Sequence, residues 1–130
     1  MTSIPESYAD LLHGVVSLST LNPDGYPQVT AVLARLQDDG KIHTSVNNAR
    51  QKYKNLVARP KATVFAMDPA NPYRTIEIRV DAELIPDHNK EWTKAFIAGS
   101  VDVDAIDGDA ERFHVVLTPT KVNTFSPSSL

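Results

Sequence analysis

The sequence predicts an α+β fold, mainly β, in which six or seven antiparallel strands close into a barrel with flanking helices. Two turn sequences, NPDGYP at 22–27 and QDDG at 37–40, separate three β-branched, alternating segments near the N-terminus. More alternating segments follow each of two helical stretches further along the chain. Because a meander of this length would leave exposed strand edges, closure into a barrel is expected.

The individual elements follow from local pattern and punctuation. A short helix is expected within 2–12, where Pro5 and Glu6 mark its start, and further helices are expected at 49–59 and 87–99. Asn48 is the expected cap of the second helix and Pro60 its end. Strands are expected at 14–21, 28–36, 41–46, 61–68 and 74–85, with one or two more in 112–125, where Pro119 marks a bend or an edge. Segment 100–111 is expected to be a solvated acidic loop and 126–130 a short tail. No repeat or linker interrupts the pattern, so residues 1–130 are expected to form one domain.

Composition excludes several classes of protein. Of the 130 residues, 42% are hydrophobic and 22% charged, which is typical of a globular chain. The absence of cysteine excludes disulfides and thiolate metal sites. No apolar run approaches the roughly 18 residues of a membrane helix, and the N-terminus lacks the basic-then-apolar plan of a signal peptide. A soluble, cytoplasmic protein with no membrane partner is therefore expected.

Charge is segregated along the chain although the net charge is only −3. Segment 81–111 holds nine acids and two lysines, whereas segment 41–61 holds no acid. The cations of the basic segment are Lys41, Arg50, Lys52, Lys54, Arg59 and Lys61. A local anion site explains this distribution better than a nucleic-acid surface, which would be basic overall and lined by aromatics. Tyr53 is the only aromatic residue in the basic segment, so no nucleic-acid partner is expected.

The start of the second predicted helix carries the sharpest functional signal. Arg50, Lys52 and Lys54 fall in its first two turns, where the helix dipole disfavours cations by roughly 0.3–1 kcal/mol each. Backbone N–H groups at the same end lack partners within the helix. Three neutral donors, Ser45, Asn47 and Asn48, come just before it. A bound phosphate would turn all of these into favourable contacts, while a solvated basic face is the alternative.

Other kinds of site have weaker support. The four histidines, His13, His43, His88 and His114, lie in separate elements without ligand spacing, so no metal site is expected, although a barrel could bring two of them together. The carboxylates of segment 102–109 do not match a calcium loop. No nucleophile motif is present.

Four segments together resemble one known family. They are LSTLNPDGYPQVTAV, NNARQKYKNLVARPKATVFAMD, NPYRTIEIRVDAELI and RFHVVLTPTKVNTF, which in this order span almost the whole chain. The chain resembles the pyridoxamine 5'-phosphate oxidase-like, FMN-binding split β-barrel family, and in particular the small actinobacterial oxidoreductases that use the deazaflavin coenzyme F420. The resemblance implies a split β-barrel, and a homodimer with the cofactor at the interface between the two barrels.

The resemblance also implies roles for particular residues. Arg50 and Lys52 match the R-x-K of the phosphate motif, with Lys54 two residues further on, and Ser45 and Asn47 line the approach. Four strand residues would lie under the ring system, mainly through backbone contacts: Val29, Thr30, Ala31 and Val32. Candidates for binding the anionic polyglutamate tail are Arg35, Lys61, Arg74 and Arg79.

The implied reaction is hydride transfer from reduced F420 to a small organic acceptor, with the cofactor supplying the chemistry. FMN ends its ribityl chain in a phosphate too, so an FMN-dependent oxidoreductase of the same fold is an alternative. A non-catalytic carrier of F420 or flavin is another. No side chain stands out as a catalytic acid or base, and the sequence does not choose a substrate.

Overall fold

Six antiparallel strands form a closed barrel in the computed structural model, which describes residues 2–127. The strand order is β1-β2-β3-β6-β5-β4. The strands are β1 His13–Leu21, β2 Pro27–Leu36, β3 Ile42–Asn47, β4 Lys61–Asp68, β5 Asn71–Pro86 and β6 Arg112–Phe125. The mainly β, antiparallel fold predicted from the sequence is confirmed. The end of the tail expected at 126–130 lies outside the described residues.

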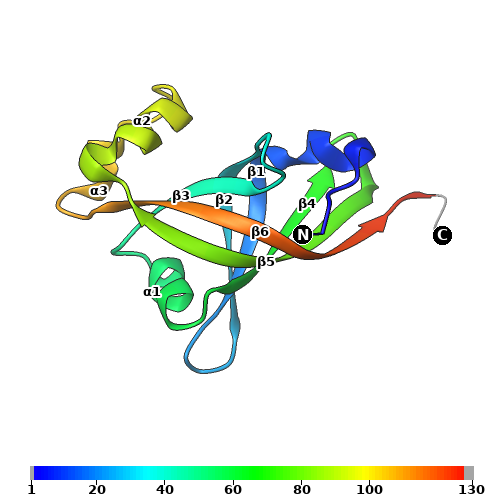
Figure 1. The fold of residues 1–130 in the computed structure, drawn as a ribbon, viewed down its shortest axis with the longest axis horizontal. Helices are drawn as coiled ribbons and strands as arrows, with labels where there is room; N and C mark the ends of the chain where they lie inside the picture. The colour runs from blue at the N-terminus through cyan, green and yellow to red at the C-terminus, as the bar shows by residue number, and fades with distance from the viewer. Residues whose placement is uncertain (1, 128–130) are drawn as a thin grey trace.

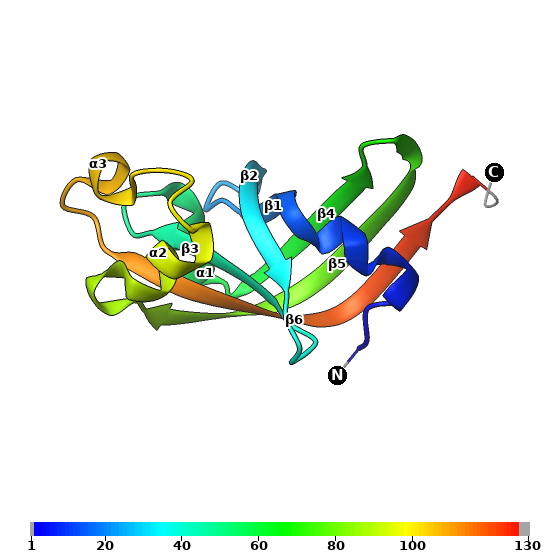
Figure 2. The same ribbon diagram turned by 90° about the horizontal axis from the view of Figure 1, so that it is seen from above.

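Within residues 2–127, five short helical elements flank the barrel. They are the 3-10 helices η1 Glu6–Leu12 and η2 His88–Lys90 and the α-helices α1 Gln51–Ala58, α2 Glu91–Ile97 and α3 Val103–Asp107. Figures 1 and 2 show the three α-helices gathered at one end of the barrel, with η1 and both termini toward the other. No helix in the described part of the chain is long and apolar enough to cross a membrane.

Strict alternation of side chains explains the barrel interior. Five aliphatic side chains, each from a different strand, are fully or almost fully buried: Leu18, Val64, Ile78, Ile42 and Leu117. Their neighbours along the chain point outward, because successive side chains in a strand face opposite sides. Each such aliphatic side chain stabilises the fold by roughly 1.5–3 kcal/mol relative to exposure.

The barrel is split between β2 and β3. These strands pair only where 34–36 meets 42–44, whereas β1 pairs with β2 over its full length. Beyond Ala34 and Thr44 the two strands diverge, and α1 and α2 lie at the resulting opening (Figures 1 and 2). The split leaves one backbone edge of residues 28–33 outside the ladder with β3, which creates room for a groove.

Two expected helix boundaries are corrected. Helix α1 begins at Gln51, and Arg50 rather than Asn48 is its N-cap residue, without a side-chain capping bond. The side chain of Asn48 instead accepts a hydrogen bond from the backbone N–H of Glu111. The helix expected over 87–99 is broken, because Asn89 and Lys90 have positive φ angles of 56° and 59° that separate η2 from α2.

The C-terminal third also differs in detail from expectation. The segment expected to be a solvated acidic loop contains α3, whose first turn is capped by the side chain of Asp102, and it buries Asp107. A single strand, β6, covers 112–125. The bend expected at Pro119 coincides with a register shift, since Val80 pairs with Pro119 while Arg79 pairs with Lys121.

Candidate functional site

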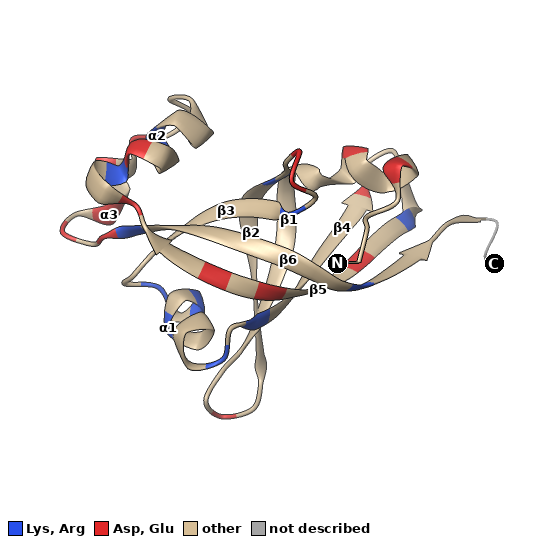
Figure 3. Ribbon diagram, viewed as in Figure 1, with Lys and Arg blue, Asp and Glu red and all other residues tan. Residues whose placement is uncertain are grey.

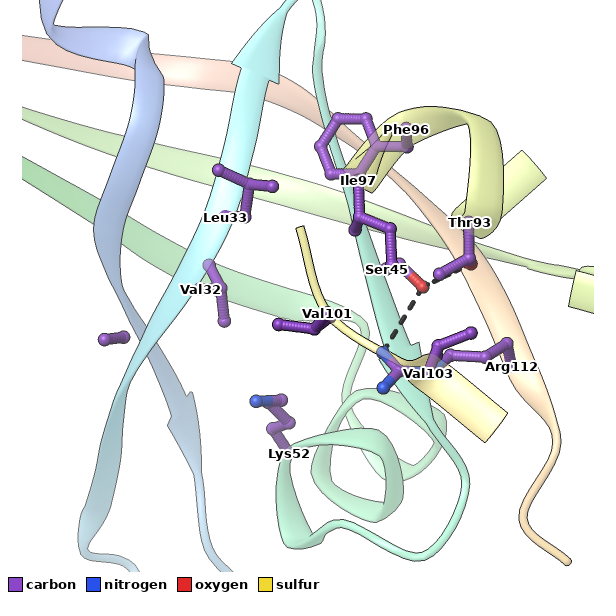
Figure 4. Close-up of a pocket in the computed structure, with 11 residues that line it drawn as sticks. Val32, Leu33, Ser45, Lys52, Thr93, Phe96, Ile97, Val101, Val103 and Arg112 are labelled. Atoms are coloured by element: carbon purple, nitrogen blue, oxygen red, sulfur yellow. Dashed lines mark hydrogen bonds between the residues drawn. The ribbon is translucent and has the colours of Figure 1, made fainter. Parts of the chain in front are cut away.

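A groove at the split consists of two connected hollows. The outer hollow, about 570 Å³, lies at the start of α1 and is lined by Gln28, Thr30, Ala31, Asn47, Ala49, Arg50, Gln51, Lys52 and Arg112. The inner cavity, about 190 Å³, lies beneath α2 and is lined by Ala31, Val32, Leu33, Ser45, Lys52, Thr93, Phe96, Ile97, Val101, Val103 and Arg112 (Figure 4). Ala31, Lys52 and Arg112 belong to both, so they mark the junction.

Helix α1 is fixed to the barrel by two neighbouring side chains. Leu56 is fully buried in the core. Asn55, also buried, donates to Thr20 and Asn22 of the first hairpin, each at 3.0 Å, and accepts from Gln51 at 2.8 Å. With the amide satisfied on both sides, the start of α1 is held in one orientation toward the groove.

Two of the three cations of the outer hollow, Arg50 and Lys52, have no acidic partner within the described residues. Among the described residues, no ion pair joins Arg50 or Lys52 to a carboxylate, and Arg50 provides no side-chain cap for α1. Burial, reinforced by the positive charges of Arg50 and Arg112, lowers the pKa of Lys52. The hollow therefore concentrates positive charge and helix N–H donors, an arrangement that an anion would stabilise.

The three neutral donors expected beside this helix have partners within the protein. Asn47 is buried, donates to Asp107 at 2.9 Å and accepts from the N–H of Ala49 at 3.1 Å. Asn48 is tied to Glu111, as described above. Ser45 shares a 2.6 Å hydrogen bond with Thr93 of α2. Of the three, Ser45 and Asn47 line the groove, whereas Asn48 lines neither hollow.

Arg112 is a groove residue that the sequence reasoning missed. It stands directly opposite Asn47 in the β3–β6 ladder. Its guanidinium makes two 2.8 Å hydrogen bonds to Asp107, whose side chain is 0% exposed. Burial would raise the pKa of Asp107, but hydrogen bonds from Arg112 and Asn47 hold it below its usual value. The only local signal was an arginine at the start of a strand.

The predicted ring-binding residues of β2 split into two directions. Ala31 faces outward into the groove and Val32 inward, with its side chain buried. Val29 is 61% exposed and lies on the outer face next to β1 instead of in either hollow. Thr30 lines the outer hollow, and its Oγ1 is the one buried side-chain oxygen or nitrogen within residues 2–127 that lacks a hydrogen-bond partner. A buried hydroxyl without a partner needs an explanation, such as a water molecule or a ligand that satisfies it.

Most of the basic residues considered for an anionic tail are occupied. Arg74 is bound by Asp10 and Asp68, Lys61 pairs with Asp81, and Arg35 donates to the carbonyl of Phe96 at 2.7 Å. Arg79 is exposed and lines neither hollow. Lys54 is also exposed and lies outside both hollows, so the structure does not bring it together with Lys52.

Two of the four histidines meet, as a barrel allows. Nδ1 of His43 lies 2.8 Å from Nε2 of His114, and the other ring nitrogen of His43 lies 2.8 Å from Asp39. The ring of His114 stacks on Trp92 of α2, with centroids 3.7 Å apart. No group of three or more metal-ligating side chains occurs in the described part of the chain. This pair fastens α2 to the barrel and does not line the groove.

The chain is thus a small antiparallel barrel that is split between β2 and β3 and carries Arg50 and Lys52 beside the split. The family model for pyridoxamine 5'-phosphate oxidase matches residues 4–126, so the chain belongs to that family. The resemblance inferred from the four sequence segments is thereby confirmed. No curated protein sequence gives a significant match.

Several solved structures are similar to the chain in fold. An F420 reductase is 31% identical, with a TM-score of 0.76, covering 92% of this chain and 98% of its own. HupZ of Group A Streptococcus is 17% identical, with a TM-score of 0.74 and 93% of each chain covered. HutZ, the heme storage protein of Vibrio cholerae, is 16% identical, with a TM-score of 0.61 and 87% of each chain covered. The last two show a shared fold alone.

Proposed function

We propose that this protein is an oxidoreductase that uses reduced coenzyme F420 for hydride transfer to a small organic acceptor. The observation that carries the proposal is the pair of cations, Arg50 and Lys52, that line the outer hollow at the start of α1. Lys52 and Arg50 have no carboxylate partner within the described residues, and their charges face a groove large enough for an extended ligand. A phosphate in the outer hollow would be held by these two side chains and by the N–H groups that open α1.

The groove fits the shape and polarity of a phosphorylated flavin-like cofactor. The unpaired edge of β2 can bind polar atoms between phosphate and ring, and Thr30, whose buried Oγ1 lacks a partner within the described residues, lies on this strand. When bound, the cofactor supplies the hydride, so the protein requires no nucleophile of its own. The protein's contribution is to bind the phosphate, to orient the ring and to exclude water through α2, with solvent protonating the acceptor.

F420 is preferred to FMN on the strength of the neighbour at 31% identity, which is an F420 reductase. Both cofactors end the ribityl chain in a phosphate, so Arg50 and Lys52 serve either. Arg59 is exposed near α1 and forms no ion pair within residues 2–127, which leaves it available to the carboxylates of an F420 tail. Figure 3 shows this basic region around α1, apart from the acidic region of α2 and α3.

A homodimer is part of the proposal. The outer face of β1, β2 and β4 exposes Val15 to 73%, Val29 to 61%, Met67 to 51% and Phe65 to 41%. These side chains border a shallow hollow of about 360 Å³ that also includes Thr30 and Ala31. A second copy that covers this apolar face would close the groove from the side where β2 is exposed.

A turnover assay tests the enzyme proposal. Purified protein is mixed with reduced F420 and menadione, and F420 oxidation is followed by its absorbance. We expect steady turnover that falls strongly in Lys52→Ala and little in Lys54→Ala. Tight binding of F420 without oxidation by any acceptor would identify a carrier instead. Turnover with FMN but not with F420 would identify a flavin-dependent oxidoreductase.

Light scattering tests the dimer separately. We expect twice the chain mass for the wild type and a monomer for Val15→Glu, with Val57→Glu, an exposed valine on α1, as the matched control that remains dimeric. A wild-type monomer at micromolar concentration would contradict the interface.

A further inference from the structure

The inner cavity is lined by apolar side chains and by four polar ones, Ser45, Lys52, Thr93 and Arg112. Ser45 comes from β3 and Arg112 from the start of β6, and Nη1 of Arg112 lies 3.5 Å from Oγ of Ser45. Figure 4 shows this pair beside the apolar side chains that surround the cavity. These are Val32, Leu33, Phe96, Ile97, Val101 and Val103. A ligand that enters the cavity would therefore meet both apolar side chains and the Ser45–Arg112 pair.

Asp107 determines what Arg112 offers to the cavity. The carboxylate binds Nε and Nη2 of Arg112, each at 2.8 Å, and also accepts from Asn47 and contacts Lys90 at 3.3 Å. Its oxygens are thus saturated by protein donors. Nη1 has only the long contact to Ser45, so Arg112 presents a fixed, incompletely used N–H donor to a ligand.

Asp87 determines the direction of the Ser45 hydroxyl through Thr93. As a carboxylate, Asp87 can only accept, so Thr93 donates its hydroxyl hydrogen to Asp87 at 2.6 Å. The hydroxyl of Ser45, 2.6 Å from that of Thr93, must then donate to Thr93. Its hydrogen is thereby used within the protein, and Ser45 presents an acceptor oxygen to the cavity.

We propose that Ser45 and Arg112 together recognise a lactam or imide edge of a planar heterocycle. The carbonyl oxygen of the edge would accept from Arg112, and the adjacent ring N–H would donate to Ser45. Two hydrogen-bond networks, one anchored on the buried Asp107 and one on the part-buried Asp87, fix this donor–acceptor order before any ligand arrives. The inference rests on the proposed function, because the inner cavity is the extension of the proposed cofactor groove.

The test uses 5-deaza-FMN and its 3-methyl derivative, which keeps the phosphate but replaces the imide N–H with a methyl group. Affinities are measured by fluorescence titration of the full chain. We expect wild-type protein to bind the parent about tenfold more tightly, the effect of about one strong hydrogen bond. Ser45→Ala should abolish the preference, and Thr93→Val, which frees the serine hydrogen, should reduce it. Ser7→Ala, on the exposed surface of η1, should leave it unchanged.

The outcomes separate this inference from the proposed function. Binding of both compounds with equal affinity, or a preference that survives in Ser45→Ala, would overturn the inference while leaving the phosphate site intact. Failure of F420, 5-deaza-FMN and FMN alike to bind would overturn both. Loss of the preference in Ser45→Ala, with unchanged affinity for inorganic phosphate, would establish the edge contact.

Discussion

Two arginine-containing regions at opposite ends of the barrel differ in whether their cations have acidic partners. Near η1, Arg74 bonds to Asp10 at 2.7 Å and Asp68 at 3.2 Å, donates to the carbonyl of Ser7 and lies over the ring of Tyr8. At the start of α1, Arg50 and Lys52 have no acidic partner in the described part of the chain. The first region uses its cation to hold the N-terminal segment on the barrel, whereas the cations of the second are the ones that we propose bind a ligand.

Arg112 stands between these two cases. One side of its guanidinium is bound by Asp107 and the other faces the groove. Hydrogen bonds and opposite charge from Asp10 and Asp68 raise the pKa of Arg74, whereas burial and neighbouring positive charge lower the pKa of Lys52. The partners of a cation, more than its position in the sequence, thus distinguish a structural role from a binding role.

The largest effect is expected when Arg112 loses its acidic partner, Asp107. Asp107→Ala would leave Arg112 partly buried beside Lys90 without compensation, so we expect the free energy of unfolding to fall by about 3 kcal/mol. Chemical denaturation measures the loss. Asp109→Ala, an exposed acid two residues away, is the control and should lose almost nothing. Equal stability of both variants would show that Asp107 is not part of the fold's support.

Lys52→Ala removes a cation that has no acidic partner within the described residues. We expect cofactor affinity to fall by about 2 kcal/mol, roughly 30-fold, as for a charge-assisted phosphate contact. Stability of the ligand-free protein should stay level or rise, because repulsion with Arg50 and Arg112 is relieved. Lys54→Ala on the same helix is the matched control for affinity. An equal loss in both variants would mean that the helix acts as a diffuse basic surface.

Arg74→Met should lower stability and leave cofactor affinity unchanged, the reverse of what is expected for Lys52→Ala. Loss of its contacts to Asp10, Asp68 and Ser7 would loosen η1, so we expect a thermal midpoint a few degrees lower. Cofactor affinity should be unchanged, because Arg74 lies far from both hollows. Calorimetry and titration on the same sample separate the two effects. Weakened binding would instead place Arg74 in the site, as the sequence first suggested.

The smallest effect is a pH dependence of binding at Lys52. Its pKa in the ligand-free protein lies below 10.5, and a bound anion would raise it. Affinity should therefore be full near neutral pH and decline as pH rises through that lowered pKa. The free energy of unfolding of the ligand-free protein should instead increase as pH rises through the same range, because the unfolded chain holds the Lys52 proton more tightly than the folded protein does. Lys52→Arg, charged throughout, should show neither slope, and a wild-type affinity that stays flat to pH 10.5 would contradict the shift.

Local pattern was sufficient to predict most of the barrel. The alternation around NPDGYP and QDDG placed β1, β2 and β3 within a residue or two, since hairpin pairing is set by adjacent sequence. The break before α2 was not predictable. Lys90 adopts a left-handed conformation that favours glycine, and its ammonium contacts Asp104 and Asp107 about fifteen residues away.

The candidate site was predicted in part. Arg50 and Lys52 are visible from sequence, because their position in the first turn of a helix is a local property. Arg112 enters through the pairing of β3 with β6, which joins residues 65 positions apart, and its partner Asp107 sits in a segment that reads as solvated. Long-range pairing and tertiary burial, both absent from local pattern, decide those two residues.

The most direct test of the account is a parallel titration of purified protein with F420 and with FMN, read by quenching of cofactor fluorescence. The account expects saturable binding of F420 that is tighter than that of FMN, lost on Lys52→Ala and retained on Lys54→Ala. Failure of both cofactors to bind, or binding indifferent to Lys52, would contradict the claim that the unpaired cations at the start of α1 hold a cofactor phosphate.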